Sequence, residues 1–336
     1  MVMANTKDDF KTVLAQAREL VKDQLALSEN VIMDVAKSAP KGISDRLISL
    51  FGRKGKRIRS TMLCLVANCG TQAPDANRVA HACASVELLH LASLVHDDII
   101  DGTEMRRGQI TAHKEWGTQV AVLIGDYVLS QAMRCVIDET ARNVPVIISD
   151  AADKLIVGEI MELDHSGDMG LSRGSYNEII DGKTAALIDA AARIGGILAG
   201  FDDAMVDECA KMGTHFGIAF QIIDDLLDYG YGSNNMDKAK FTDLSNGLIT
   251  LPLLYYFENC NAAERSEMEG LVKKAAQEGI PEIIIEKLKV KGSFEKAKAE
   301  AQEHLEKALE IANKFPKSNF TEELVAMFAS MSDRGN

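Results

Sequence analysis

HLASLVHDDIID, residues 90–101, is an apolar segment that ends in Asp-Asp-x-x-Asp. The same ending recurs in FGIAFQIIDDLLD, residues 216–228. Residues four apart share one face of an α-helix, so each motif aligns its first and last carboxylates. Like charges at this spacing, near a helix C-terminus, destabilise the helix unless cations neutralise them. The motifs therefore predict two long helices whose ends bind cations through Asp97 and Asp101 and through Asp224 and Asp228, with Asp98 and Asp225 as further candidate catalytic residues of the same motifs.

Magnesium is the cation that suits two facing carboxylate pairs. Mg²⁺ usually takes one or two protein carboxylates and completes its shell with water and substrate phosphate oxygens. We therefore predict that Asp97 and Asp101, together with Asp224 and Asp228, hold Mg²⁺ ions on a diphosphate. Neither motif continues as a glycine-centred twelve-residue loop, which argues against EF-hand calcium. The alternative is that both motifs are solvated acidic helix ends without a ligand. The occurrence of the same ending on two strongly apolar helices argues against this alternative.

Helical periodicity extends over almost the whole chain of 336 residues, which has 5 % aromatic residues and only six prolines. No segment alternates in the manner of a strand, and no linker separates residues 40 and 260, so we predict a single all-α domain over 1–336. The longest irregular stretch, 229–247, is expected to be a functional loop. Helices are expected at 8–38, 43–52, 56–70, 75–101, 117–140, 145–165, 174–199, 203–231, 248–259, 263–277, 280–289, 292–314 and 319–331.

The formal net charge of −13 makes nucleic acid an improbable partner. Anionic substrates would therefore need local cations. No apolar run reaches the ~18 residues that span a membrane, and the start of the chain lacks a signal peptide pattern. We expect a cytoplasmic protein with at most a peripheral membrane contact. The cysteines form no CxxC pair, so reduced thiols are expected at Cys64, Cys69, Cys83, Cys135, Cys209 and Cys260.

Three short basic segments are candidate diphosphate ligands. GRKGKRIR, residues 52–59, opens a predicted helix, whose N-terminus favours phosphate. Arg106 and Arg107 follow the first aspartate motif by five residues. Lys183 and Thr184 follow a glycine but do not form a P-loop, because Asn177 stands where that pattern needs glycine. Taken singly, the first and third segments are more easily explained as surface lysines and arginines.

Together, the two aspartate motifs, GKRIR at 55–59 and HDDIIDGTEMRRG at 96–108 make the sequence resemble the trans-isoprenyl diphosphate synthases, or polyprenyl synthetases. The resemblance covers about residues 52–252. It implies an isoprenoid-synthase-type helical bundle around a deep central cavity, a homodimer, and Mg²⁺-dependent condensation of isopentenyl diphosphate with an allylic diphosphate. It implies an isopentenyl site of Lys56, Arg59, His90 and Arg107. It implies an allylic site of Arg106, Lys183, Thr184, Gln221 and Lys238.

The sequence departs from the family pattern at several positions. Ser60 stands where proline is usual, and Asp237 and Phe241 alter a glycine-containing loop. Leu248 replaces a lysine that would bind diphosphate, and Lys240 is a candidate substitute. These changes leave open the alternative that the protein is a catalytically weak family member that serves as a binding subunit.

Product length is expected to depend on the helix turn before the first motif. Ala92 and Ser93, five and four residues before Asp97, are small and leave a channel open. We therefore expect a long-chain all-trans polyprenyl diphosphate, with geranylgeranyl diphosphate as the alternative. A class I terpene cyclase would not need an isopentenyl site, and a non-enzymatic helical scaffold would need neither aspartate motif.

Overall fold

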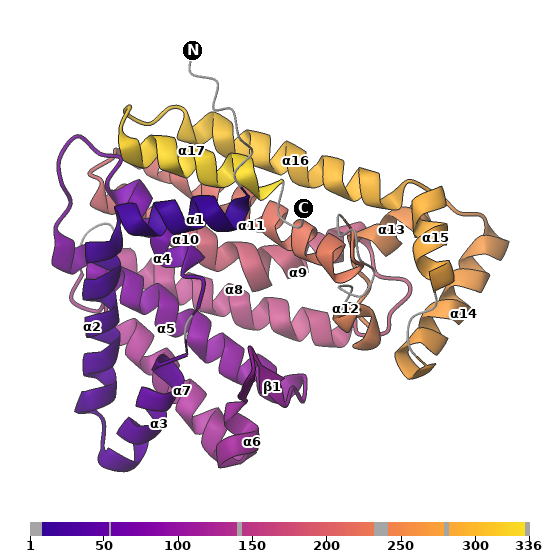
Figure 1. Ribbon diagram of the computed structural model, residues 1–336, viewed down its shortest axis with the longest axis horizontal. Coiled ribbons are helices and arrows are strands. Elements are labelled where there is room, and N and C mark those ends of the chain that lie inside the picture. The colour runs from indigo at the N-terminus through magenta and orange to yellow at the C-terminus, as the bar shows by residue number, and fades with distance from the viewer. Residues whose placement is uncertain (1–8, 54, 140–142, 232–240, 279–281, 333–336) are drawn as a thin grey trace.

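Helices α5 (Ala76–Ile100) and α11 (Asp203–Asp228) carry the aspartate motifs and run through the bundle in the computed structural model (Figure 1), which describes residues 9–53, 55–139, 143–231, 241–278 and 282–332. Each helix starts at an aspartate N-cap. Asp75 accepts hydrogen bonds from the backbone N–H groups of Asn77 and Arg78, and Asp202 accepts one from Met205. These caps satisfy N–H groups that the first helical turn leaves unpaired. Both helices therefore have defined starts and place their C-terminal aspartates at fixed positions.

The remaining elements surround these two helices. Helix α10 packs between α4 and α11, α5 packs on α2 and α7, and α16 packs along α11. The other elements are α1 (Phe10–Leu20), α2 (Lys22–Ser38), α3 (Lys41–Phe51), α4 (Ile58–Ala67), β1 (Met105–Arg106), β2 (Gln109–Ile110), α6 (Ala112–Trp116), α7 (Thr118–Arg134), α8 (Val144–Asp164), α9 (Arg173–Ile180), the π-helical turn η2 (Asp181–Ala185), α10 (Ala186–Leu198), α12 (Thr242–Ser245), α13 (Leu251–Glu258), α14 (Ala262–Glu278), α15 (Glu282–Val290), α16 (Ser293–Ala312) and α17 (Asn319–Met331).

One continuous cluster of buried apolar side chains extends from Phe10 to Met331. It includes the rings of Phe216 and Phe328, whose centroids lie 4.8 Å apart and whose planes are tilted by 33°. Such an aromatic contact adds to the stabilisation that burial of the rings provides. The predicted all-α fold is confirmed. The continuity of the core supports the proposal that residues 1–336 form a single domain.

Three local features differ from the predicted helices. The expected helix 8–38 divides at Val21, whose φ of −113° and ψ of 19° interrupt the helix between α1 and α2. The expected helix 174–199 contains the π-helical turn η2. The sequence also gave no sign of the hairpin of β1 and β2, which pair antiparallel. These short features contain too few residues to produce a periodic pattern.

Helix α5 is, among the described residues, the one helix long and apolar enough to cross a membrane by length and composition. The expectation that no segment passes this test is therefore wrong. Within the bundle, 61 % of its most apolar window is buried, as in the core helix of a globular protein. The six cysteines are free thiols; Cys135 and Cys260 are half-buried and the other four are buried.

Candidate active site

An acidic cavity of about 350 Å³ lies where α5 and α11 end. Asp97 and Asp101 reach it from α5, and Asp224 and Asp225 reach it from α11. Helix α8 adds Glu162, and the loop after α12 adds Leu248. The two motifs, more than one hundred residues apart in sequence, therefore face the same space.

The middle aspartate of each motif is a hydrogen-bond partner for a protein side chain. Asp98 is buried and accepts a 2.6 Å hydrogen bond from Arg106 Nε. Asp225 is buried and accepts hydrogen bonds from Tyr176 Oη at 2.7 Å and Gln221 Nε2 at 2.9 Å. Both carboxylates therefore fix neighbouring groups of the site.

The last aspartate of the second motif has a different environment. The two carboxylate oxygens of Asp228 accept backbone N–H groups of Thr242 at 3.1 Å and Asp243 at 3.2 Å. These contacts lie at the start of α12, where Phe241 has a positive φ of 51°. Asp228 thus joins the end of α11 to α12. It is not among the residues that line the acidic cavity.

Burial and crowding of carboxylates make the acidic cavity strongly attractive to cations. Burial, together with the nearby Glu159 carboxylate, raises the pKa of Asp97 to about 7, although Lys183 opposes this rise. Burial also raises the pKa of Asp101 and of Glu162. Burial and the carboxylates of the second motif raise the pKa of Asp243. A bound cation would favour the ionised form of each group.

The carboxylates of the cavity fit a hard divalent cation. Among the residues that the structure describes, no three His, Cys, Asp or Glu side chains are grouped closely enough to hold a metal ion by themselves. A divalent cation bound here would therefore take further ligands from water and phosphate. Asp97, Asp101 and Asp224 line the cavity and supply only carboxylate oxygens, which hard cations prefer.

Lys183 lies beside the acidic cavity because two helices approach closely there. A Cβ added to Gly158 of α8 would come within 2.7 Å of the Lys183 backbone nitrogen, so glycine is needed at this contact. The ammonium group of Lys183 pairs with Glu159 at 2.9 Å and with Glu162. Burial alone would lower the pKa of Lys183, but the two carboxylates raise it overall. Lys183 is therefore a permanently charged group at the site.

The neighbouring Thr184 belongs to a chain of hydrogen bonds. Its hydroxyl donates to Gln221 Oε1 at 2.6 Å, and Gln221 in turn donates to Asp225. Thr184 and Lys183 both lie in η2, and π-helical turns occur frequently at functional sites.

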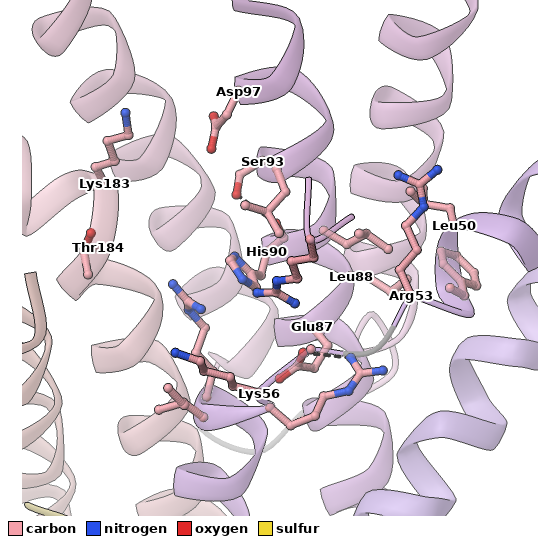
Figure 2. A pocket seen from close by; sticks show the side chains of 18 of the residues that line it. Leu50, Arg53, Lys56, Glu87, Leu88, His90, Ser93, Asp97, Lys183 and Thr184 are labelled. Carbon is pink, nitrogen blue, oxygen red and sulfur yellow. Dashed lines mark hydrogen bonds and ion pairs between the residues drawn. The ribbon is translucent and has the colours of Figure 1, made fainter. Parts of the chain in front are cut away.

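A basic cavity of about 340 Å³ adjoins the acidic one (Figure 2). Lys56, Arg59, His90 and Arg107 line it. Burial, and then the charges of Arg59 and Arg107, hold the pKa of His90 well below its usual value. His90 is therefore neutral. The Nε of Arg59 is buried and has no hydrogen-bond partner among the described residues, as expected of a group that awaits a ligand.

The β1–β2 hairpin positions the two arginines that follow the first motif. Its turn residues, Arg107 and Gly108, have positive φ values of 53° and 78°. Two consecutive positive φ values are typical of a type I′ turn, which connects antiparallel strands tightly. Arg106 lines the acidic cavity, and Arg107 lines the basic one.

The predicted product-length residues differ in their surroundings. Ser93 lines the basic cavity between Asp97 and His90 (Figure 2). Its hydroxyl donates to the His90 carbonyl at 2.9 Å. Ala92 is 2 % exposed and is not among the residues that line the described cavities. The geometry therefore supports Ser93 more directly than Ala92.

Part of the altered loop falls outside the residues that the structure describes. Lys238, Asp237 and Lys240 lie outside the described residues. Leu248 lines the acidic cavity, so an apolar side chain occupies the position where the family pattern has lysine.

Sequence reasoning did not identify Glu159, Glu162, Tyr176 and Glu87 as site residues. The two glutamates lie three residues apart on α8 and so share a face, which was an available but weak signal. Tyr176 and Glu87 act through side-chain hydrogen bonds to residues 49 and 27 positions away, which no local pattern reveals.

The comparisons with known proteins identify the family. Residues 40–287 match the polyprenyl synthetase family. A nonaprenyl diphosphate synthase of Mycobacterium tuberculosis is 38 % identical over 238 residues, which is 70 % of each chain. A decaprenyl diphosphate synthase from Rhodobacter capsulatus has a similar structure, with a TM-score of 0.88 and 26 % identity over 96 % of this chain and 99 % of that chain.

A further solved structure carries ligands. A polyprenyl synthase from Caulobacter crescentus, in complex with calcium and isoprenyl diphosphate, has a TM-score of 0.82 and 28 % identity, and the match covers 96 % of this chain and 98 % of that chain. The family match spans well over half of the sequence. The chain described here therefore belongs to the polyprenyl synthetase family of all-helical prenyltransferases.

Proposed function

We propose that this prenyltransferase condenses isopentenyl diphosphate with an allylic diphosphate and repeats the step to give a long-chain all-trans polyprenyl diphosphate. One observation carries the proposal: the acidic and the basic cavity meet. They share as lining residues Leu94, Asp97, Lys183, Thr184, Gln221 and Asp224. Two anionic substrates can therefore lie side by side, one held through cations on carboxylates and the other directly by basic side chains.

In this proposal, Asp97, Asp101 and Asp224 hold Mg²⁺, and Asp228 supports Asp224 from the end of α11. Lys56, Arg59, His90 and Arg107 bind isopentenyl diphosphate. Arg106, Lys183, Thr184 and Gln221 bind the allylic diphosphate, and Lys238 is proposed to join them. The magnesium assignment draws support from the carboxylate-only donor set and from the calcium complex of the Caulobacter crescentus enzyme.

The residues suit an ionisation mechanism. Bound Mg²⁺ supplies positive charge that stabilises a leaving diphosphate. Arg106 and Lys183 are fixed cations on the same cavity and stabilise the charge that develops as the allylic C–O bond breaks. The isopentenyl double bond then attacks the allylic cation, and a proton is lost to the released diphosphate. Leu91, Leu94 and Phe220 on the cavity wall limit the access of water to the cation.

The basic cavity distinguishes this function from a terpene cyclase. A cyclase has one diphosphate substrate and does not need a second anion site. The buried, unpartnered Nε of Arg59 and the neutral imidazole of His90 are suited to such a second anion.

We further propose a homodimer. Helix α8 exposes Ile156, Ile160 and Leu163, which are 53 %, 52 % and 49 % exposed. Their spacing of i, i+4 and i+7 places them on one face of the helix, and such an apolar stripe typically packs against a partner. A second copy of the chain is the proposed partner. Light scattering should give twice the chain mass for the wild type, and Ile160→Glu should shift the protein towards monomer.

The protein is also proposed to be cytoplasmic and to contact a membrane only transiently, when the apolar product is released. Its net charge of −13 disfavours a lasting contact with anionic lipid. Vesicle flotation should recover little protein without product and more after turnover.

Product chromatography tests the main proposal. Purified protein is incubated with isopentenyl diphosphate, Mg²⁺ and geranyl, farnesyl or geranylgeranyl diphosphate. We expect consumption of isopentenyl diphosphate and products longer than geranylgeranyl diphosphate, both abolished by a chelator. Absence of consumption with every primer would favour a binding subunit, and a geranylgeranyl end product would correct the assigned chain length.

A further inference from the structure

Glu87 is a buried carboxylate in the basic cavity, and it lies between His90 and Lys56 in Figure 2. It is 7 % exposed. Its Oε2 accepts a 2.8 Å hydrogen bond from Arg57 Nη1, and its Oε1 accepts one of 2.7 Å from the Ser60 hydroxyl. The backbone N–H of Ser60 lies 3.3 Å from the same oxygen. A negative charge at the base of a cavity for an anion calls for a specific explanation.

We propose that Glu87 is a positioning residue that clamps the segment 55–60, so that Lys56 and Arg59 face the diphosphate of isopentenyl diphosphate. The inference rests on the proposed assignment of that site to the basic cavity. The two residues that Glu87 holds, Arg57 and Ser60, alternate along the chain with Lys56 and Arg59. A fixed Arg57 and a fixed Ser60 therefore restrict the directions in which the two proposed ligands can point.

The backbone of this segment needs such a contact. Arg57 has a φ of 56°, in the left-handed region that residues other than glycine rarely adopt. It precedes α4, which begins at Ile58 without a side-chain N-cap hydrogen bond. The Ser60 and Thr61 hydroxyls donate locally to the Arg57 carbonyl, at 3.2 and 2.6 Å, and the ion pair to Glu87 is the buried long-range contact that holds the Arg57 side chain.

Ser60 contributes contacts to Glu87 that a proline at this position could not make. The family pattern leads one to expect proline here, and proline has neither a hydroxyl nor a backbone N–H to donate. With serine, both donors of residue 60 reach the same carboxylate oxygen. The first turn of α4 is thereby joined to the middle of α5.

Electrostatics and positioning predict opposite effects when the charge of Glu87 is removed. By Coulomb attraction alone, Glu87→Gln would make the cavity more positive and would strengthen diphosphate binding. If Glu87 positions the segment, the same change weakens binding, because a glutamine amide cannot accept from both Arg57 and Ser60 in the observed geometry. The sign of the change in KM therefore separates the two roles.

The experiment compares Glu87→Gln and Ser60→Ala with a matched control, Glu29→Gln. Glu29 also lies near Arg57, at 3.8 Å, but its side chain is 58 % exposed. We expect the KM for isopentenyl diphosphate to rise about tenfold in Glu87→Gln and a few-fold in Ser60→Ala, as for lost hydrogen bonds to a charged group. The KM for the allylic substrate, kcat and the control should stay within about twofold of the wild type.

Thermal unfolding of each variant shows whether it is folded at the assay temperature. An unchanged or lower KM for isopentenyl diphosphate in folded Glu87→Gln overturns the proposal. If Glu87→Gln does not fold, Ser60→Ala provides the test. An unchanged KM for isopentenyl diphosphate in Ser60→Ala then overturns the proposal. Lys56→Ala separates the clamp from the site assignment. A raised KM in Lys56→Ala but not in Glu87→Gln refutes only the clamp, whereas no change in Lys56→Ala refutes the assignment of the cavity.

Discussion

Leu248→Lys tests whether the departure from the family pattern weakens the allylic site. Leu248 is half-buried on the acidic cavity, and its backbone N–H donates to the Asp243 carbonyl at 2.9 Å. That backbone contact does not depend on the side chain, so the substitution should leave the loop in place. The cavity already contains six carboxylates against Arg106 and Lys183 as its fixed cations. A lysine at position 248 would therefore add positive charge to a cavity whose charged lining residues are mostly acidic.

The magnitude follows from a charge-assisted contact. A hydrogen bond between an ammonium and a phosphate oxygen stabilises a complex by about 1.5–3 kcal/mol. Position 248 is partly exposed, so solvent screening reduces this to about 1–2 kcal/mol. That free energy corresponds to a fall of about 5–30-fold in the KM for the allylic diphosphate. Part of it is lost if the new lysine first pairs with Asp243 in the free enzyme.

The assay is the initial rate at saturating isopentenyl diphosphate and Mg²⁺, with the allylic diphosphate varied. Leu248→Met is the control, because it keeps an apolar side chain of similar volume and should leave the KM unchanged. The reasoning fails if Leu248→Lys also leaves the KM unchanged while the protein remains folded. His165 lines the same cavity and would then be the first described residue to examine as an alternative diphosphate ligand.

Four further outcomes are expected. Asp224→Ala should lower kcat/KM on the order of a thousandfold without loss of fold, and near-normal turnover would refute its role in metal binding. Ser93→Phe should shorten the product seen by chromatography, because the ring lies about 6 Å along α5 from Asp97; Ala92→Phe should instead overpack the core and lower stability by about 1–3 kcal/mol. Burial, with a contribution from His215, lowers the pKa of His304 to about 4 from 6.5. Because the pKa of His304 is lower in the folded protein than in the unfolded chain, the unfolded chain takes up a proton first as the pH falls. The free energy of unfolding is therefore unaffected above pH 6.5 and decreases as the pH falls from 6.5 towards 4. His304→Gln should therefore remove an acid destabilisation on the order of 1 kcal/mol in denaturant titrations, after allowance for partial exposure.

Long periodic segments were predictable because their pattern is local. The expected helices at 75–101, 203–231 and 319–331 correspond to α5, α11 and α17 with boundary shifts of three residues or fewer. Pro252 lies in the first turn of α13, where its fixed φ is tolerated. The aspartate motifs were equally readable, since their spacing alone places carboxylates on one helix face.

What the sequence did not reveal depends on contacts between distant segments. The role of Glu87 depends on hydrogen bonds to Arg57 and Ser60 from another helix, and the pairing of Lys183 with Glu159 depends on the close approach that Gly158 permits. The hairpin at 105–110 is too short to alternate. These features are consequences of packing, which a single sequence read locally does not specify.

The repeated Asp-Asp-x-x-Asp motif combines two tasks on each helix. Successive residues of a helix are separated by about 100° around its axis, so the first and second aspartates cannot both face the cavity squarely. Asp97 and Asp224 line both cavities. Asp98 and Asp225 are more deeply buried and accept hydrogen bonds from Arg106 and Gln221, and Asp225 also lines the acidic cavity. The more buried carboxylate thus fixes a proposed diphosphate ligand beside the less buried one that is proposed to hold metal. In the proposed function, each motif would place a metal-binding carboxylate beside a residue that binds diphosphate, which gives a physical reason for two adjacent aspartates with unlike burial in both motifs.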